Sequence, residues 1–242
     1  MKILEMQLRE VVTRSGRTRR VESGECTEHP GSMLPACRHC LIDARVEGDR
    51  RAVADWYAAV QGEECDQRIP EVFRDARVGH PGVTEWVRQW AEEPGASPWL
   101  VLSGPVGVGK THESYAALRA AATSGHPLTW EAHSAGEIYA SLRPTPGVST
   151  EARMRAYQTT GLLLVDDLGA TKASEWVEET THRLINYRYE RRLPVIITTN
   201  VLISEMTHVI GDRITSRLAQ MSQVVRMTGP DRRRKNTKGD QK

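Results

Sequence analysis

The sequence predicts an α/β protein with a five-stranded parallel sheet covered by helices. Two observations carry this prediction. From residue 99 onward, short apolar runs bounded by turn residues alternate with helix-like stretches, the pattern of a parallel sheet with crossover helices. The first of these runs also passes through a glycine-rich turn into an Ala-rich helix. The chain before residue 80 lacks this alternation, and we expect it to form a small helical N-terminal module.

The glycine-rich turn has the pattern G-x-x-x-x-G-K-T between the apolar run 99–102 and the helix-like stretch 112–123. Glycines let the backbone N–H groups turn toward a phosphate, and the following helix adds the positive end of its dipole. We therefore expect ATP here, with Lys110 on the β- and γ-phosphate oxygens and the Thr111 hydroxyl on Mg²⁺. The residues expected to bind nucleotide are Gly104, Pro105, Val106, Gly107, Val108, Gly109, Lys110, Thr111 and His112.

The apolar run 162–165 ends in Asp166 and Asp167. Four uninterrupted apolar residues predict a central strand buried on both faces, so the carboxylates emerge at its carboxyl end, where the glycine-rich turn also lies. We expect Asp166 to hold Mg²⁺ through water and Asp167 to orient and activate the attacking water. Asn200 follows the next buried run, and either bonds the lytic water or the γ-phosphate or caps the next helix.

The other elements are predicted from periodicity and from turn residues. Residues 1–22 are expected as a helix or a partly ordered arm, and the linker is placed at 79–82, before a short helix capped by Thr84. Further helices are expected over 41–65, 134–142, 176–188 and 211–218, and further strands over 128–130 and 223–227.

All four cysteines fall in the first third of the chain, and three of them form C-x2-H-x7-C-x2-C with a histidine. In a chain from a reducing compartment, such paired spacings favour Zn²⁺ over disulfides. The expected structural site uses Cys26, His29, Cys37 and Cys40. His39 is an alternative to His29, and Cys65 is surplus and expected to be buried. The alternative to a zinc site is structural thiols with accidental spacing.

The charge is nearly balanced, at +2, so no global charge argument for nucleic acid holds. Basic residues gather near residues 14–20 and in a basic, disordered tail at 234–242, where they are either solvated ends or contacts to a phosphate backbone. No apolar run approaches the roughly 18 residues that span a bilayer, and the first ten residues are amphipathic rather than signal-like. We therefore expect a cytoplasmic protein with no membrane partner.

The order of the glycine-rich loop, Asp166-Asp167, Asn200 and the pair Arg213 and Arg217 resembles that of AAA+ ATPases. The stretches 185–189, 193–200, 213–218 and 228–233 resemble the DnaC/DnaI-type replicative helicase loaders more closely, and IstB-like transposition helpers share this domain. The resemblance covers roughly residues 84–233. It implies an AAA+ P-loop ATPase domain at 81–233, preceded by a partner-binding module at 1–80 that carries zinc in the DnaI-like branch.

The resemblance also implies that ATP-bound subunits assemble side by side into oligomers and hold single-stranded DNA along the inside. Arg217 then acts in trans on a neighbour's γ-phosphate, and Arg213 shares that role or holds the subunit interface. The second carboxylate is Asp167, one methylene shorter than the glutamate common in AAA+ enzymes, so hydrolysis is expected to be slow and stimulated by DNA or a partner.

Three functions follow from these expectations. The first is ATP-dependent loading of a hexameric, DnaB-like replicative helicase onto single-stranded DNA. The second is an IstB-like ATPase helper of a DNA transposase, which predicts binding to duplex DNA. The third is a non-catalytic adaptor with nucleotide as a structural ligand. The third is disfavoured, because a structural nucleotide needs neither a water-activating carboxylate nor an arginine finger.

Overall fold

Five parallel strands form the central sheet of the computed structural model, which describes residues 9–12, 18–21, 24–25, 33–34, 50–144, 147, 149–202 and 205–232. The spatial order is β6-β7-β8-β5-β9. The strands are β5 (Trp99–Ser103), β6 (Trp130–Ser134), β7 (Leu162–Asp166), β8 (Val195–Thr199) and β9 (Ser222–Arg226). The predicted α/β class with a five-stranded parallel sheet is confirmed.

The strand order places β5 between β8 and β9. From β5 the chain crosses to β6 at the far edge, returns through β7 and β8, and adds β9 on the other side of β5. In open parallel sheets, ligands bind at the carboxyl ends of the strands where the order reverses. This topology puts the ends of β5, β7 and β8 together at one edge of the sheet.

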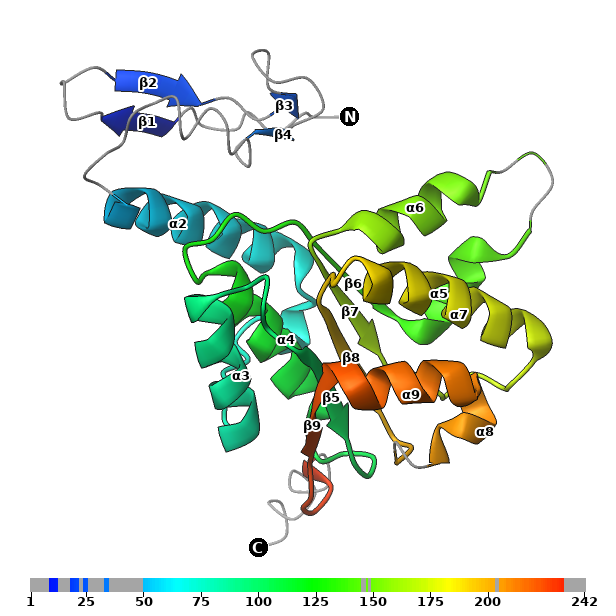
Figure 1. Cartoon of the computed structure of the whole chain (residues 1–242). Helices are drawn as coiled ribbons and strands as arrows, with labels where there is room; N and C mark the ends of the chain where they lie inside the picture. Colours follow the sequence, from blue (N-terminus) through cyan, green and yellow to red (C-terminus); the bar gives the residue numbers. More distant parts are fainter. Residues whose placement is uncertain are drawn as a thin grey trace, which may run out of the picture.

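Helices cover both faces of the sheet, as Figure 1 shows. One face carries α2, α3 and α4, together with a short 3-10 turn, η1, and the other carries α5 to α9. Residues alternate between the two cores, with Val101 and Ile197 on one side and Leu100 and Ile196 on the other. The bounds are α2 (Arg50–Arg68), η1 (Glu71–Phe73), α3 (Pro81–Glu92), α4 (Lys110–Ala122), α5 (Ala135–Leu142), α6 (Glu151–Thr159), α7 (Glu175–Glu190), α8 (Thr207–Ile210) and α9 (Asp212–Met221).

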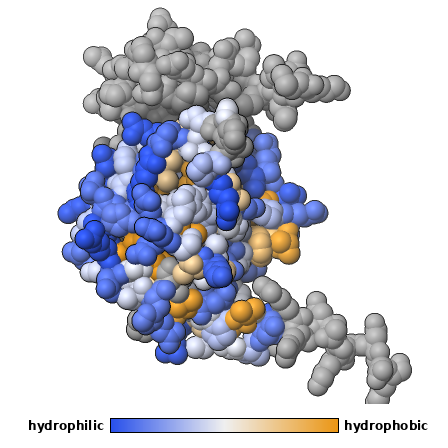
Figure 2. All heavy atoms as spheres, turned by 90° about the vertical axis from the view of Figure 1, so that its right-hand side faces the viewer, coloured by the Kyte–Doolittle hydropathy of each residue, from blue (hydrophilic) through white to orange (hydrophobic). Residues whose placement is uncertain are grey.

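The side of the molecule that carries the α5 to α9 layer has a mainly polar surface. Figure 2 shows this face as mostly hydrophilic, with small and separate hydrophobic areas. Helices of a surface layer turn their apolar stripe toward the core and their polar side chains toward water. Among the described helices, none is long and apolar enough to cross a bilayer.

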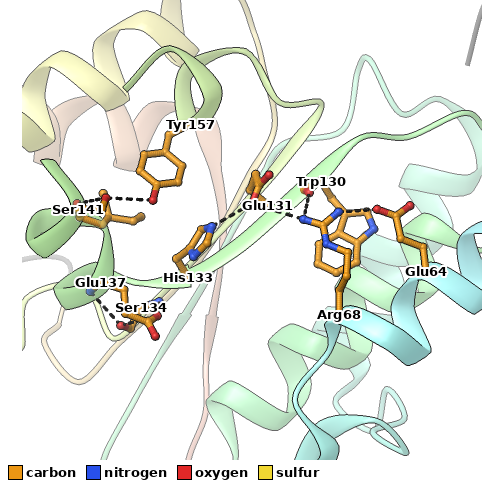
Figure 3. A network of polar contacts seen from close by, with 10 residues as sticks. Glu64, Arg68, Trp130, Glu131, His133, Ser134, Glu137, Ser141 and Tyr157 are labelled. Atoms are coloured by element: carbon orange, nitrogen blue, oxygen red, sulfur yellow. Dashed lines mark hydrogen bonds and ion pairs between the residues drawn. The ribbon is translucent and has the colours of Figure 1, made fainter. Parts of the chain in front are cut away.

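Helix α2 is tied to the edge strand β6 by a polar network (Figure 3). The Arg68 guanidinium lies 4.0 Å from the centre of the Trp130 ring and donates to the Trp130 carbonyl at 2.9 Å. Glu131 lies between Arg68 and His133, with Arg68 Nη2 at 3.4 Å and His133 Nε2 at 2.9 Å from its carboxylate. Beneath this network, Cys65 packs in the same apolar cluster as Trp86. Residues 50–80 therefore share a core with the sheet, and the role of 1–80 as a partner-binding module stays a prediction.

Arg188 of α7 is fully buried and joins three elements. It donates hydrogen bonds to the carbonyls of Tyr157, Gln158 and Thr160 at the end of α6, and to that of Pro194 before β8. Burial lowers the pKa of Arg188 to about 9, so it stays charged at pH 7. The last carbonyls of a helix have no partner within it, so Arg188 supplies a C-terminal cap for α6.

The N-terminal residues differ from the prediction of a helix or arm. Residues Arg9–Val12 (β1) and Thr18–Val21 (β2) pair as antiparallel strands, and Gly24–Glu25 (β3) pairs with Met33–Leu34 (β4). The β-branched residues in β1 and β2 favour strands over helix. The predicted zinc ligands Cys26, His29, Cys37 and Cys40 lie outside the described residues, as does the basic tail at 234–242.

Three other boundaries move. Helix α2 begins at Arg50 rather than 41. Helix α3 begins at Pro81 rather than at Thr84, because His80 Nδ1 accepts a hydrogen bond from Gly82 N–H at 3.1 Å and caps the helix. The second strand of the sheet spans Trp130–Ser134 rather than 128–130. It is an edge strand of the sheet, and its residues after Trp130 are only partly buried. An edge strand tolerates polar residues, so no apolar run marked it.

Candidate nucleotide site

A cleft of about 830 Å³ lies at the carboxyl ends of β5, β7 and β8. Its lining contains nine of the predicted site residues, which are Val106, Gly107, Gly109, Lys110, Thr111, His112, Asp166, Asp167 and Asn200. Of the other residues predicted in the loop, Gly104 and Pro105 support it from outside the lining, and Val108 is buried in the core. The glycine-rich loop and the carboxylates, more than 50 residues apart in sequence, therefore share one cleft.

The loop adopts a backbone that only glycine accommodates. Gly104, Gly107 and Gly109 have φ values of 152°, 85° and 98°, a region that side chains with a Cβ rarely adopt. A Cβ on Gly104 would lie 2.1 Å from the carbonyl oxygen of Met227, and one on Gly107 would lie 2.1 Å from Asp231 Oδ1. The glycines thus serve both the turn and the close approach of another segment.

That other segment follows β9 and was not predicted as part of the site. Met227 N–H donates to the Ser103 carbonyl at 2.7 Å, and Arg232 N–H donates to the Gly107 carbonyl at 2.9 Å. The contacts carry the chain across the glycine-rich loop, and Arg232 joins the lining of the cleft. The sequence shows a run of basic residues that begins at Arg232, but nothing in it indicates that Arg232 reaches the nucleotide cleft.

Lys110 is only 8 % exposed and lies at the start of α4. Its ammonium donates to the Gly104 carbonyl at 2.8 Å, the Pro105 carbonyl at 2.7 Å and Asn200 Oδ1 at 2.7 Å. These acceptors neutralise part of the cost of burying a charge. They hold the ammonium of Lys110 against the glycine-rich loop. To contact a phosphate, the ammonium would have to leave these acceptors.

Thr111 and Asp166 face each other across the cleft. Thr111 Oγ1 donates to Asp166 Oδ1 at 3.0 Å, with Oδ2 at 3.2 Å. A hydroxyl oxygen beside a carboxylate is a donor set that suits a hard cation such as Mg²⁺. The two residues therefore fit the predicted Mg²⁺ site, and a bound cation would neutralise phosphate charge there.

Asp167 takes the left-handed backbone conformation, with φ 57°, which costs a non-glycine residue about 1 kcal/mol or more. Asn200 Nδ2 donates to Asp167 Oδ1 at 2.6 Å. The side chain of Asn200 thus bonds both Lys110 and Asp167, which favours a role in the site over a helix cap.

The opposite wall of the cleft is apolar and comes from η1. Val72 is 77 % exposed and lines the cleft beside Phe73, which stacks on Tyr115 of α4 with the ring centres 5.0 Å apart. Burial, with smaller contributions from Asp166 and Glu137, raises the pKa of Tyr115 to about 12, so it stays neutral. Sequence reasoning missed this wall, because a single short turn carries no periodicity.

Arg213 and Arg217 do not reach the cleft of their own chain. Both belong to α9, where Arg213 lines a separate groove of about 510 Å³ with acidic residues of α7. Arg217 Nη1 lies 3.3 Å from His182 Nε2, and its guanidinium lies 5.1 Å from the Tyr189 ring centre. A role for these arginines in hydrolysis therefore requires the site of a neighbouring subunit.

Comparison with known proteins gives a family and relatives. The model of the IstB-like ATP binding protein family matches residues 94–239. The replicative helicase loader DnaI of Bacillus subtilis is 25 % identical over 166 residues, 62 % of this chain and 52 % of DnaI. The replicative helicase loader DnaC of Escherichia coli K12 is 24 % identical over 152 residues, 61 % of either chain. The chain therefore spans about half to three fifths of the length of these relatives.

Solved structures show the same fold. The crystal structure of the DnaC helicase loader superposes with a TM-score of 0.57 at 21 % identity, over 66 % of this chain and all of that one. The crystal structure of DnaI superposes with a TM-score of 0.57 at 20 % identity, over 66 % of this chain and 95 % of that one. The AMPPCP-bound DnaA of Aquifex aeolicus superposes with a TM-score of 0.54 at 22 % identity, over 62 % of this chain and 48 % of that one.

The matched residues contain the whole cleft apart from Val72 and Phe73. They include the glycine-rich loop, the two aspartates and Asn200, in the order predicted from the sequence. With more than half of its length matched, this chain belongs to the IstB-like ATP-binding protein family and is related to the DnaC and DnaI helicase loaders.

Proposed function

We propose that this chain is an ATPase that loads a hexameric replicative helicase onto single-stranded DNA. The observation that carries the ATPase part is the chain of contacts in the cleft, from Thr111 to Asp166 and from Lys110 through Asn200 to Asp167. The relationship to DnaI and DnaC, both described as replicative helicase loaders, supports the choice of partner.

Each residue of the cleft has a role in this proposal. Lys110 exchanges its carbonyl acceptors for the β- and γ-phosphate oxygens, while Thr111 and Asp166 hold Mg²⁺. Asp167 orients and activates the attacking water, and Asn200 fixes the carboxylate of Asp167. Because general-base action needs a carboxylate within hydrogen-bond reach of the water, the anchored position of Asp167 matters more than its length.

Completion of the site requires a neighbouring subunit. Arg217, with Arg213 beside it, contacts the γ-phosphate bound to the next subunit and stabilises charge in the transition state. Hydrolysis is then coupled to assembly, because a lone subunit lacks this cation in its own cleft. The groove around Arg213 also contains acidic residues. In the assembly, these would attract a basic surface of the next subunit.

For single-stranded DNA, the best candidates are arginines of the segment between β6 and β7. Arg153 and Arg155 are exposed on α6, and Arg143, at the end of α5, lies with its guanidinium 5.6 Å from the Trp176 ring centre. Exposed guanidinium groups bind phosphates without reading sequence. In this proposal the N-terminal 1–80 module, with structural zinc, grips the helicase.

A second candidate function is favoured by the family match itself. The family model is that of the IstB-like ATP-binding proteins, and an ATPase helper of a DNA transposase would use the same cleft. It differs in its nucleic acid, since it acts on duplex DNA. A non-catalytic adaptor remains the third reading and predicts no turnover.

The test is ATP turnover by the purified protein alone, with single-stranded DNA and with duplex DNA at equal nucleotide concentration. We expect slow turnover that single strands stimulate. Stimulation by duplex DNA alone would move the assignment to the transposition helper, and absence of turnover under all conditions, with ATP still bound, would favour the adaptor. Lys110→Ala is the negative control. Lys172→Ala is the matched control, because it removes an exposed lysine outside the cleft. A Lys110→Ala variant with normal ATP affinity would overturn the loop assignment.

A further inference from the structure

Thr198 contacts both aspartates of the cleft. It lies in β8 and is 1 % exposed. Its hydroxyl donates to Asp166 Oδ1 at 2.6 Å and accepts a hydrogen bond from the backbone N–H of Asp167 at 2.8 Å. One buried hydroxyl therefore donates a hydrogen bond to the carboxylate of Asp166 and accepts one from the backbone of Asp167.

These contacts occur where the β7–β8 ladder ends. The last paired residues are Val165 and Ile197, and beyond them Asp167 turns into the left-handed conformation. The Leu168 N–H donates to the Thr198 carbonyl at 2.8 Å. Thr198 thus accepts hydrogen bonds from two successive backbone amides of the turn, one through its side chain and one through its main chain. A buried N–H without an acceptor would destabilise this turn.

Asp166 is held from two sides. Its Oδ1 atom accepts hydrogen bonds from Thr111 of α4 and from Thr198 of β8. Since a hydroxyl has one proton and two lone pairs, Thr111 keeps a lone pair for a cation while its proton points to Asp166. The second donor, Thr198, also lines the cleft, but it is only 1 % exposed and its hydroxyl is engaged with the two aspartates.

We propose that Thr198 is a positioning residue that orients Asp166 for Mg²⁺ and anchors the strained turn at Asp167. This inference rests on the proposed ATPase site and adds a residue to it. Partners of this kind, which orient metal-binding groups through hydrogen bonds, typically change metal affinity by roughly 10- to 100-fold when they are lost. Thr198 should therefore govern the Mg²⁺-dependent part of ATP binding and leave the Mg²⁺-independent part unchanged.

The test compares Thr198→Val, which keeps the shape and removes the hydroxyl, with Thr198→Ser, which keeps the hydroxyl. Thr199→Val is the matched control, because Thr199 is equally buried in the same strand and its hydroxyl accepts a hydrogen bond from Val201 N–H instead of contacting the aspartates. Binding of a fluorescent ATP analogue is titrated with Mg²⁺ and repeated in a chelator. Thermal unfolding of each variant is measured in parallel.

We expect Thr198→Val to raise the Mg²⁺ concentration at half-saturation by about tenfold, with unchanged affinity in chelator. Thr198→Ser and Thr199→Val should match the wild type. The proposal is overturned if Thr198→Val keeps the wild-type Mg²⁺ dependence, or if affinity falls equally with and without Mg²⁺. Valine places a methyl group where the hydroxyl of Thr198 accepted from the Asp167 N–H. If Thr198→Val therefore fails to fold, Thr198→Ala removes the hydroxyl without adding that methyl group and replaces it in the comparison. A wild type that binds Mg-ATP but shows no DNA-stimulated turnover contradicts the loader function and leaves this test intact.

Discussion

Asn200 donates a 2.6 Å hydrogen bond from its Nδ2 atom to Asp167 Oδ1. The amide oxygen of the same side chain accepts from Lys110 at 2.7 Å. One asparagine therefore links the lysine expected on the phosphates to the carboxylate expected to activate water. In the proposed site, a γ-phosphate would compete with Asn200 for Lys110, and this single amide would then connect nucleotide binding with the orientation of Asp167.

The first prediction concerns that amide. Asn200→Ala should lower ATP turnover by about 100-fold, the usual effect of losing one preorganised donor, while the affinity for ATP changes little, since the glycine-rich loop and Lys110 still hold the phosphates. Steady-state turnover and equilibrium binding of an ATP analogue measure the two effects. Asn186→Ala is the control, because Asn186 is an α7 asparagine that bonds Glu190. Turnover equal to that of the wild type would remove Asn200 from the site.

The second prediction concerns the arginine finger. Arg217→Ala should bind ATP normally but lose turnover by about 1000-fold or more, as expected of a finger acting in trans. Raising the protein concentration should not rescue it, whereas mixing it with Asp167→Asn should restore partial turnover, because each variant supplies what the other lacks. Arg226→Ala, an exposed arginine of β9, is the control. Equal hydrolysis by monomeric wild-type and variant proteins would contradict action in trans.

The third prediction concerns stability. Arg188→Ala should lower the free energy of unfolding by about 3 kcal/mol or more. It removes the buried guanidinium that donates to the carbonyls at the end of α6 and to that of Pro194, and it opens a cavity. Urea unfolding followed by circular dichroism measures the change. Arg191→Ala, at the exposed end of the same helix, should change stability by no more than about 0.5 kcal/mol. A loss that small for Arg188→Ala would show that water replaces the guanidinium.

The fourth prediction concerns Cys65, which is free and buried. Burial raises the pKa of its thiol to about 11, so almost no thiolate exists between pH 7 and 9. In a variant with serine at positions 26, 37 and 40, Cys65 should react with a thiol reagent only after denaturation, even at pH 9. Rapid labelling of the native variant at pH 9 would contradict the observed packing of α2.

The fifth prediction concerns zinc and rests on the sequence alone. Metal analysis should find one bound Zn²⁺ in the wild type and markedly less in Cys37→Ser, since a tetrahedral site loses a thiolate ligand. Chelation should release the metal without abolishing ATP binding by the cleft. Cys65→Ser should keep its zinc. Equal zinc content in wild type and Cys37→Ser would mean that the cysteine spacing is accidental.

The sequence by itself determined the parts of the protein that depend on local pattern. The glycine-rich loop, the buried runs at β5, β7 and β8 and the polar residues that end them were all readable, because burial on both faces requires an unbroken apolar run. The same reasoning failed for β6, whose edge position allows polar residues, and for β1 and β2, which are only four residues long and half of whose residues are charged.

Only the tertiary structure decided which of these parts meet. Three features join residues that are distant in the chain. Strand β5 pairs with β8 and β9, the segment that ends at Arg232 crosses the glycine-rich loop, and Val72 forms a wall of the cleft. Thr198 shows the limit most clearly. A threonine in a buried strand looks like ordinary core, because its propensity reports the strand and not the partner of its hydroxyl. Its two contacts with the aspartates arise only because β7 and β8 are neighbours in the sheet.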